Sequence, residues 1–147
     1  MKLRLHLIAA VLSAVFLAAF WTSTLVAEAF LDAAAVVAVK QGIAYALIVF
    51  VPLIALTGAT GFALGRGRPE ALVVRKRARM PIIAINGIAV LVPAALFLYW
   101  RAQAGVFDTA FYAVQALELI AGAANLSLIA LNFRAGLRLS RARRRSA

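Results

Sequence analysis

The chain has 147 residues, of which 65% are hydrophobic, and its formal net charge is +11. A soluble domain of this length cannot bury so large an apolar fraction, so the composition predicts a membrane protein. The chain has no cysteine and a single histidine, His6. This excludes a disulfide, a Cys/His zinc site and a bis-histidine haem site built from this chain alone. We therefore expect no metal and no cofactor.

Four long apolar segments follow one another along the chain, at about residues 5–27, 42–64, 81–100 and 110–133. Each is close to the ~20 residues that a helix needs to cross the hydrocarbon core of a bilayer. The segments lack the alternation of polar and apolar residues that marks a barrel strand. The sequence thus predicts an all-α polytopic membrane protein, a four-helix transmembrane up-down bundle forming a single membrane domain over residues 1–147.

The first segment has a second interpretation, as a signal peptide. A basic MKLRLH precedes the apolar run LIAAVLSAVFLAAF, and residues 27–29 read Ala-Glu-Ala, a pattern typical of a cleavage site. Cleavage would leave three spans. The apolar character nevertheless continues over residues 5–27, which is long enough to span a bilayer. We therefore expect a retained helix.

The cations indicate how the spans are oriented. Most of them lie before the first segment, in a basic loop at residues 65–79, or in a basic tail at residues 134–147. Each of the two other connections contains a single cation, Lys40 or Arg101. By the positive-inside rule, both termini and the basic loop are expected in the cytoplasm. The compact chain with arginine-rich ends favours a bacterial inner (plasma) membrane.

Clustered arginines beside membrane spans are attracted to anionic lipid headgroups, which explains the net charge without a nucleic acid partner. His6, close to Arg4 at the start of the first segment, is interpreted as an interfacial anchor and not as a ligand. The side chains expected to contact lipid headgroups are Arg75, Lys76, Arg77, Arg79, Arg143, Arg144 and Arg145.

Polar residues interrupt the fourth segment on one face. At 100° per residue, Gln115, Glu118, Gly122 and Asn125 fall within an arc of about 80°. An ionised carboxylate within hydrocarbon costs several kcal/mol, so Glu118 is expected to face the interior of the bundle and to mark a ligand or proton site. Lys40 is the nearest cation, and it would have to reach inward. Without a cationic partner, we expect Glu118 to be neutral and hydrogen-bonded to Gln115.

A second polar layer is predicted nearer the cytoplasm. Asn86 and Asn125 lie at a depth similar to that of Ser13, Thr57 and Thr60, so all four spans contribute a polar group. Such groups hold helices together by hydrogen bonds or line a small cavity, and the sequence leaves both roles open for the two asparagines.

Small residues and prolines predict where helices pack closely or bend. Gly58 and Gly61 in the second segment, Gly65 directly after it and Gly122 in the fourth segment are expected at close helix contacts, within the chain or between chains. Pro52 and Pro93 lie inside the second and third segments and predict kinks.

The sequence contains no catalytic constellation, because the single histidine lies far from Glu118 and a lone acid is not a mechanism. We therefore expect no enzyme, and a membrane enzyme acting on a lipid or quinone-like substrate is the least supported hypothesis. The leading hypothesis is a small inner-membrane transport or ion-handling protein with a polar stripe centred on Glu118. The alternative is a non-enzymatic accessory or assembly subunit of a larger membrane complex. Expected partners are membrane lipids and either further copies of the chain or a partner membrane subunit.

Overall fold

The structure is a computed structural model that describes residues 2–66 and 71–145. Every described element is helical. The elements, in chain order, are α1 (Lys2–Phe30), α2 (Ala33–Gly65), α3 (Ala71–Ile85), the π-helical segment η1 (Asn86–Leu91), α4 (Val92–Gln103) and α5 (Thr109–Arg145). Because α3, η1 and α4 follow each other without a break, they form one helical run from Ala71–Gln103.

Within the described residues, four helices are long and apolar enough to cross a membrane. This confirms the prediction of an all-helical chain with four potential spans, and it indicates a multi-pass membrane protein. The four candidate spans are Lys2–Phe30, Ala33–Gly65, Ala71–Gln103 and Thr109–Arg138.

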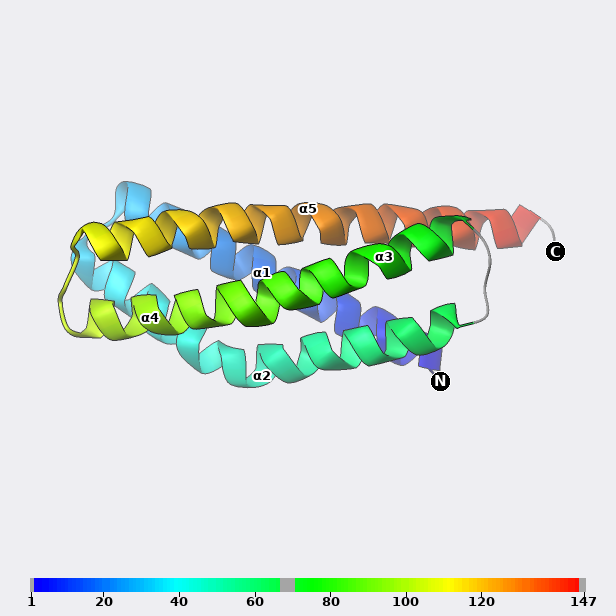
Figure 1. Cartoon of the computed structure of the whole chain (residues 1–147), viewed down its shortest axis with the longest axis horizontal. Coiled ribbons are helices and arrows are strands. Elements are labelled where there is room, and N and C mark those ends of the chain that lie inside the picture. The colour runs from blue at the N-terminus through cyan, green and yellow to red at the C-terminus, as the bar shows by residue number, and fades with distance from the viewer. Residues whose placement is uncertain (1, 67–70, 146–147) are drawn as a thin grey trace.

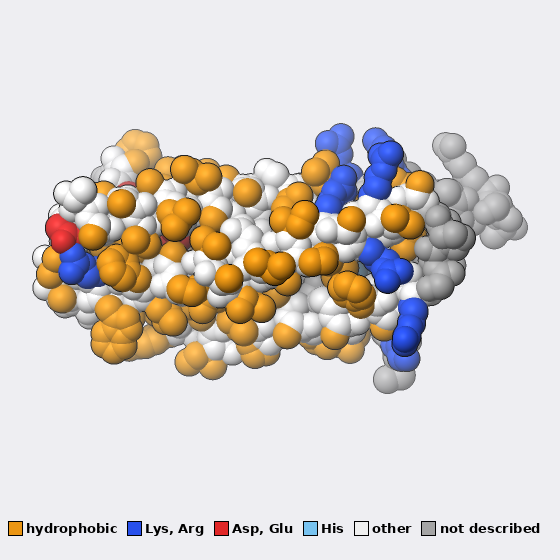
Figure 2. All heavy atoms as spheres, in the orientation of Figure 1, with side chains coloured by type: hydrophobic (Ala, Val, Ile, Leu, Met, Phe, Trp, Pro, Cys, Tyr) orange, Lys and Arg blue, Asp and Glu red, His pale blue; other side chains and the backbone are white. Residues whose placement is uncertain are grey.

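The four helical runs lie side by side along the long axis of the molecule (Figure 1). The junction between α1 and α2 lies at the same end as the connection between α4 and α5, and the N-terminus lies toward the opposite end. Hydrophobic side chains cover the middle of the surface, and most visible Lys and Arg side chains gather toward the end that holds the N-terminus (Figure 2). Exposed residues such as Ile48, Ile88 and Ile120 make a surface that suits hydrocarbon.

Two apolar clusters lie between the helices. The first joins α1, α2 and α4, with the rings of Phe20 and Phe50 packed edge to face at 5.3 Å between centroids. The second lies nearer the end with the α1–α2 junction and joins α1, α2, α4 and α5. The buried members are Leu17, Ile43, Leu47, Phe50 and Ala95 in the first cluster, and Ala27, Val36, Leu98, Ala102 and Phe111 in the second.

The connection between α4 and α5 is fixed by backbone and side-chain caps. Gly105 has φ 67°, a left-handed conformation that favours glycine. Its N–H donates to Ala102 O at 3.0 Å, and that of Val106 donates to Arg101 O at 3.0 Å, which is the Schellman arrangement at a helix C-terminus. Asp108 then caps α5 by accepting a hydrogen bond from the N–H of Phe111 at 3.0 Å.

The helices extend beyond the predicted spans. Part of the predicted basic loop at residues 65–79 is helical, because α3 begins at Ala71, and Ala, Leu, Arg and Lys all favour helix. Residues 134–145 of the predicted basic tail continue α5.

A change in helical register directly precedes Pro93, where the sequence predicts a kink. Proline has no N–H to donate to the carbonyl four residues back, so an α-helix cannot continue normally there. The preceding residue, Val92, donates its N–H to Gly87 O, five residues back, which closes the π-helical segment η1.

Candidate functional site

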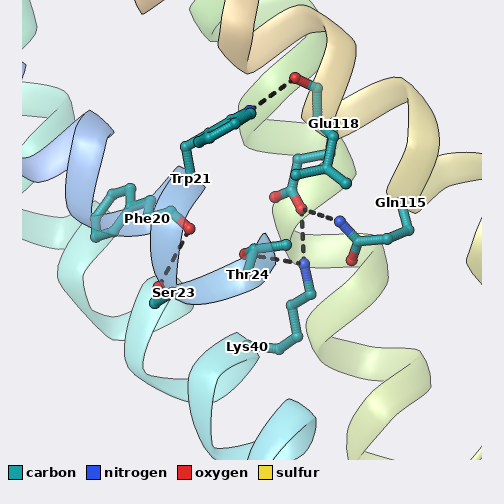
Figure 3. A network of polar contacts seen from close by, with 8 residues as sticks. Phe20, Trp21, Ser23, Thr24, Lys40, Gln115 and Glu118 are labelled. Atoms are coloured by element: carbon teal, nitrogen blue, oxygen red, sulfur yellow. Dashed lines mark hydrogen bonds and ion pairs between the residues drawn. The ribbon is translucent and has the colours of Figure 1, made fainter. Parts of the chain in front are cut away.

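The centre of the candidate site is an ion pair between α2 and α5. Lys40 Nζ lies 2.7 Å from Glu118 Oε2, and the two side chains are 1% and 13% exposed (Figure 3). The expectation that Glu118 lacks a cationic partner was therefore wrong. The predicted second span begins at residue 42, but α2 begins at Ala33, which places Lys40 well inside the helix with its flexible side chain turned inward.

Two further side chains complete the contacts of this ion pair (Figure 3). Gln115 Nε2 donates to Glu118 Oε2 at 3.2 Å, which is the hydrogen bond expected from their spacing on α5. Lys40 Nζ donates to Thr24 Oγ1 on α1 at 3.4 Å. Sequence reasoning missed Thr24, because a threonine in an apolar helix carries no signal that distinguishes a binding residue from a tolerated one.

Glu28 is a second carboxylate of the site that the sequence did not single out. It lies one turn beyond Thr24 on the same face of α1, and the negative charges of Glu28 and Glu118 both act on Lys40. Its Oε1 is buried and has no hydrogen-bond partner among the described residues. The arrangement could have been suspected from the i, i+4 spacing of Thr24 and Glu28. We call Thr24, Glu28, Lys40, Gln115 and Glu118 the outer network.

Glu118 also forms part of the wall of two cavities. The larger, of about 90 Å³, is lined by apolar residues of α1, α2, η1 and α4, and Glu118 is the one charged residue among the described lining. The smaller, of about 30 Å³, lies between α1 and α5 beside Trp21, Thr24 and Gly122. Glu118 thus contacts Lys40 on one side and empty apolar space on another.

Asn86 and Asn125 form a separate contact. Asn86, the first residue of η1, donates from Nδ2 to Asn125 Oδ1 at 3.0 Å and to Ala121 O at 2.9 Å. Asn125 Nδ2 donates to Ile83 O at 3.3 Å. This amide pair ties the third helical run to α5 about 10 Å along α5 from Glu118, counting 1.5 Å per residue. The structure therefore does not bring the two asparagines into direct contact with Glu118.

The remaining polar residues of the predicted layer pair between α1 and α2. Ser13 Oγ lies 3.4 Å from Thr57 Oγ1, and His6 Nδ1 lies 3.0 Å from Thr60 Oγ1. His6 is buried, so its interpretation as an interfacial anchor was wrong. Since Thr60 Oγ1 donates to Leu56 O at 2.6 Å, the geometry favours His6 Nδ1 as the donor to Thr60. The first apolar cluster lies between these pairs and the outer network along α1 and α2.

Three of the four predicted packing glycines lie at close contacts. A Cβ built on Gly61 would lie 2.7 Å from Met80 Cε, one on Gly65 would lie 3.1 Å from Arg77 Cδ, and one on Gly122 would lie 2.9 Å from Trp21 Cδ1. The indole N–H of Trp21 donates to Leu119 O at 2.9 Å, which fixes its ring against Gly122 (Figure 3). A Cβ on Gly58 would meet no described atom within 4 Å, so Gly58 does not lie at a close contact within the described chain, and a contact with another chain stays a prediction.

The predicted headgroup residues differ in their surroundings. Arg75 is exposed, whereas Lys76, Arg77 and Arg79 are half-buried. The guanidinium carbon of Arg77 lies 5.7 Å from the centroid of the Phe62 ring, so this side chain also packs on α2. The side chains of Arg143, Arg144 and Arg145 lie outside the described residues.

Comparison of the chain with protein-family models, with curated proteins and with solved structures finds no match. Among the described residues, no group of three or more His, Cys, Asp or Glu side chains is placed to hold a metal ion.

Proposed function

We propose that the protein is a small integral membrane transport or ion-handling protein. In this proposal, the outer network takes up and releases a proton or another cation. The observation that carries the proposal is the ion pair of Lys40 and Glu118, placed inside two helices that are long and apolar enough to cross a membrane. Charged groups within membrane spans are costly, and those that persist usually belong to an ion or substrate pathway.

The proposed topology is a four-helix up-down bundle in a bacterial inner membrane, with both termini cytoplasmic. The concentration of cations toward the N-terminal end of the molecule supports this orientation (Figure 2). It places the outer network nearer the external surface. Arg75, Lys76, Arg77 and Arg79 would then lie at the cytoplasmic headgroups, where each cation contributes about 1 kcal/mol of attraction to anionic lipid.

The charges of the outer network support exchange with a cation. Glu28 and Glu118 contribute two carboxylates, and Lys40 contributes one ammonium group. With all three ionised, the network carries one excess negative charge in a largely buried setting, which a proton or a monovalent cation neutralises. Because the negative charges of Glu28 and Glu118 both act on Lys40, the ammonium group still lies in the field of Glu28 when a cation binds Glu118.

Transfer across the membrane requires more than the static arrangement of one chain. The first apolar cluster separates the outer network from the hydroxyl and imidazole pairs on α1 and α2. We propose that a conformational change, or assembly of two or more copies, completes the route. The segment η1 supports such a change, since it lines the larger cavity and π-helical turns are often found at functional sites.

Proton flux into proteoliposomes tests this proposal. The purified protein is reconstituted, a potassium diffusion potential is applied with valinomycin, and an entrapped dye reports the internal pH. We expect faster acidification than in protein-free liposomes, with Glu118→Gln reduced to the protein-free rate. Asp108→Asn, which removes an exposed carboxylate at the end of the bundle, is the matched control and should keep the native rate. Equal rates for the native protein and Glu118→Gln would overturn the proposal.

The second candidate function, an accessory subunit, is supported by the surface around Gly58. This glycine and the exposed Ala55 and Ala59 leave a smooth strip on α2 that a partner helix could approach closely. Gly58→Leu would then remove a co-purifying membrane subunit without changing the proton flux. Retention of every co-purifying subunit in Gly58→Leu would exclude this strip as the contact.

A further inference from the structure

We propose that the outer network and the larger cavity beside it form one binding site for a primary alkylammonium ion. The positively charged head would bind at Glu118, and a short alkyl chain would fill the cavity. This inference rests on the proposed transport function, because it assigns a substrate class to the same site.

The charge of the network favours a positively charged ligand. Lys40 is 1% exposed and Glu118 is 13% exposed, so most of the ion pair is removed from solvent. Glu28 supplies a second negative charge near the same ammonium group. Uncompensated charge is costly in a buried site, and one additional monovalent cation makes the network neutral.

The unpartnered oxygens of the network favour a ligand with several N–H donors. Both hydrogen bonds to the Glu118 carboxylate from the described residues end on Oε2, which leaves Oε1 available. Gln115 is 4% exposed, yet its Oε1 has no hydrogen-bond partner among the described residues. The buried Oε1 of Glu28 also has no hydrogen-bond partner among them. A primary ammonium group provides three donors and no acceptor, as the group on Lys40 already does at Glu118 and Thr24.

The cavity favours an apolar chain and sets its size. Its walls include Leu17, Leu47, Phe50 and Ala95, and its volume is about 90 Å³. This is smaller than the ~150 Å³ cavity that binds benzene in an engineered protein, so it suits a slender chain of a few carbons. Cavities with apolar walls exclude water, which disfavours a hydrated inorganic cation. The combination of one carboxylate and an apolar wall therefore selects an organic cation.

Calorimetric titration of the full chain in lipid nanodiscs tests the proposal, with methyl-, ethyl-, propyl- and butylammonium chloride as probes at constant ionic strength. Each added methylene buried in the cavity should lower the dissociation constant about fourfold. The neutral analogue n-butanol should bind at least tenfold more weakly than butylammonium, because it lacks the charge. Equal binding of the alcohol and the amine, or no dependence on chain length, would overturn the inference.

Cavity-filling variants provide the structural control. Ala95→Leu places additional carbons in the cavity from α4, and Ala55→Leu does so from α2 if the first variant does not fold. Either change should weaken butylammonium binding at least tenfold. Ala116→Leu makes the same substitution at an exposed position of α5 and should leave binding unchanged. Unchanged binding in a folded cavity variant would overturn the inference.

The proton flux assay and the alkylammonium titration test the two proposals separately, because the flux assay contains no amine. If the native protein shows Glu118-dependent proton flux but does not bind alkylammonium, the proposed ligand is wrong and the ion-handling function stands. Alkylammonium binding that is lost in Glu118→Gln supports the ligand site even where proton flux is absent.

Discussion

Lys40 on α2 and Glu118 on α5 are 78 residues apart in the sequence, and their Nζ and Oε2 atoms lie 2.7 Å apart between the helices. Removing one partner of such a pair leaves an uncompensated charge, which is far more costly than removing both. We expect Lys40→Met to lower the free energy of unfolding by about 3–5 kcal/mol.

The double variant Lys40→Met/Glu118→Leu should regain most of that loss, since it leaves no buried charge unpaired. Reversible unfolding in mixed micelles of dodecyl maltoside and sodium dodecyl sulfate measures both variants against the native chain. If the double variant is as unstable as Lys40→Met alone, the unpaired charge of Glu118 is not the main cause of the lost stability.

Gly122 should tolerate no side chain, because the Trp21 ring occupies the space that its Cβ would need. A Cβ at this position would lie 2.9 Å from Trp21 Cδ1, and the indole is fixed by its hydrogen bond to Leu119 O. We expect Gly122→Ala to destabilise the protein by about 1–3 kcal/mol and to change the tryptophan fluorescence. Gly58→Ala, at a position with free space, should instead gain up to about 1 kcal/mol. Equal stabilities of the two variants would contradict the packing of α1 on α5.

Gly105 should be sensitive to substitution for a backbone reason alone. Its φ of 67° is left-handed, and a Cβ there would contact nothing within 4 Å among the described residues. Gly105→Ala should therefore lower the free energy of unfolding by about 1–2 kcal/mol through backbone strain. Gly136→Ala, within α5 and also in open space, should be neutral or stabilising. Thermal unfolding of the two variants measures the difference, and a neutral Gly105→Ala would exclude the left-handed turn.

The connection between α4 and α5 should weaken at acid pH. The hydrogen bond from the Arg101 guanidinium, with help from the N–H of Phe111, holds the pKa of Asp108 below its usual value. A lowered folded-state pKa means that the stabilisation is complete above the ordinary aspartate pKa of about 3.9 and is lost as the pH falls through the lower value. The rate of amide hydrogen exchange at Phe111, corrected for intrinsic exchange, should rise as the pH falls through that range in the native protein. In Asp108→Asn the rate, corrected for intrinsic exchange, should not follow this titration.

The helices and their apolar faces were predictable because hydrophobic runs of sufficient length leave few alternatives in a membrane. The ion pair was not, because it depends on where α2 begins. Residues 33–41 precede the continuous apolar run, yet Asp32 caps the helix by accepting a hydrogen bond from the N–H of Ala35 at 2.9 Å. That cap brings Lys40 into the span.

The positions of Glu28 and Asn86 relative to Glu118 were also not predictable from the sequence. Helical spacing predicted that Gln115 would reach Glu118, since both lie on one helix. The approach of Glu28 from α1 and the separation of Asn86 from Glu118 depend on how helices rotate against each other. Hydropathy and periodicity describe one helix at a time, so they do not predict how one helix is rotated relative to the next.

A pH titration of the carboxyl infrared bands in lipid tests the central claim most directly, as the difference between the native protein and Glu118→Gln. Asp108→Asn provides the difference spectrum of a carboxylate outside the network. We predict that the Glu118 signal converts between its protonated and ionised bands within the pH range over which the protein stays folded, because the proposed function requires this carboxylate to take up and release a proton. A Glu118 signal that stays in one form across this range would contradict an ion-handling site and identify the Lys40–Glu118 pair as a structural contact.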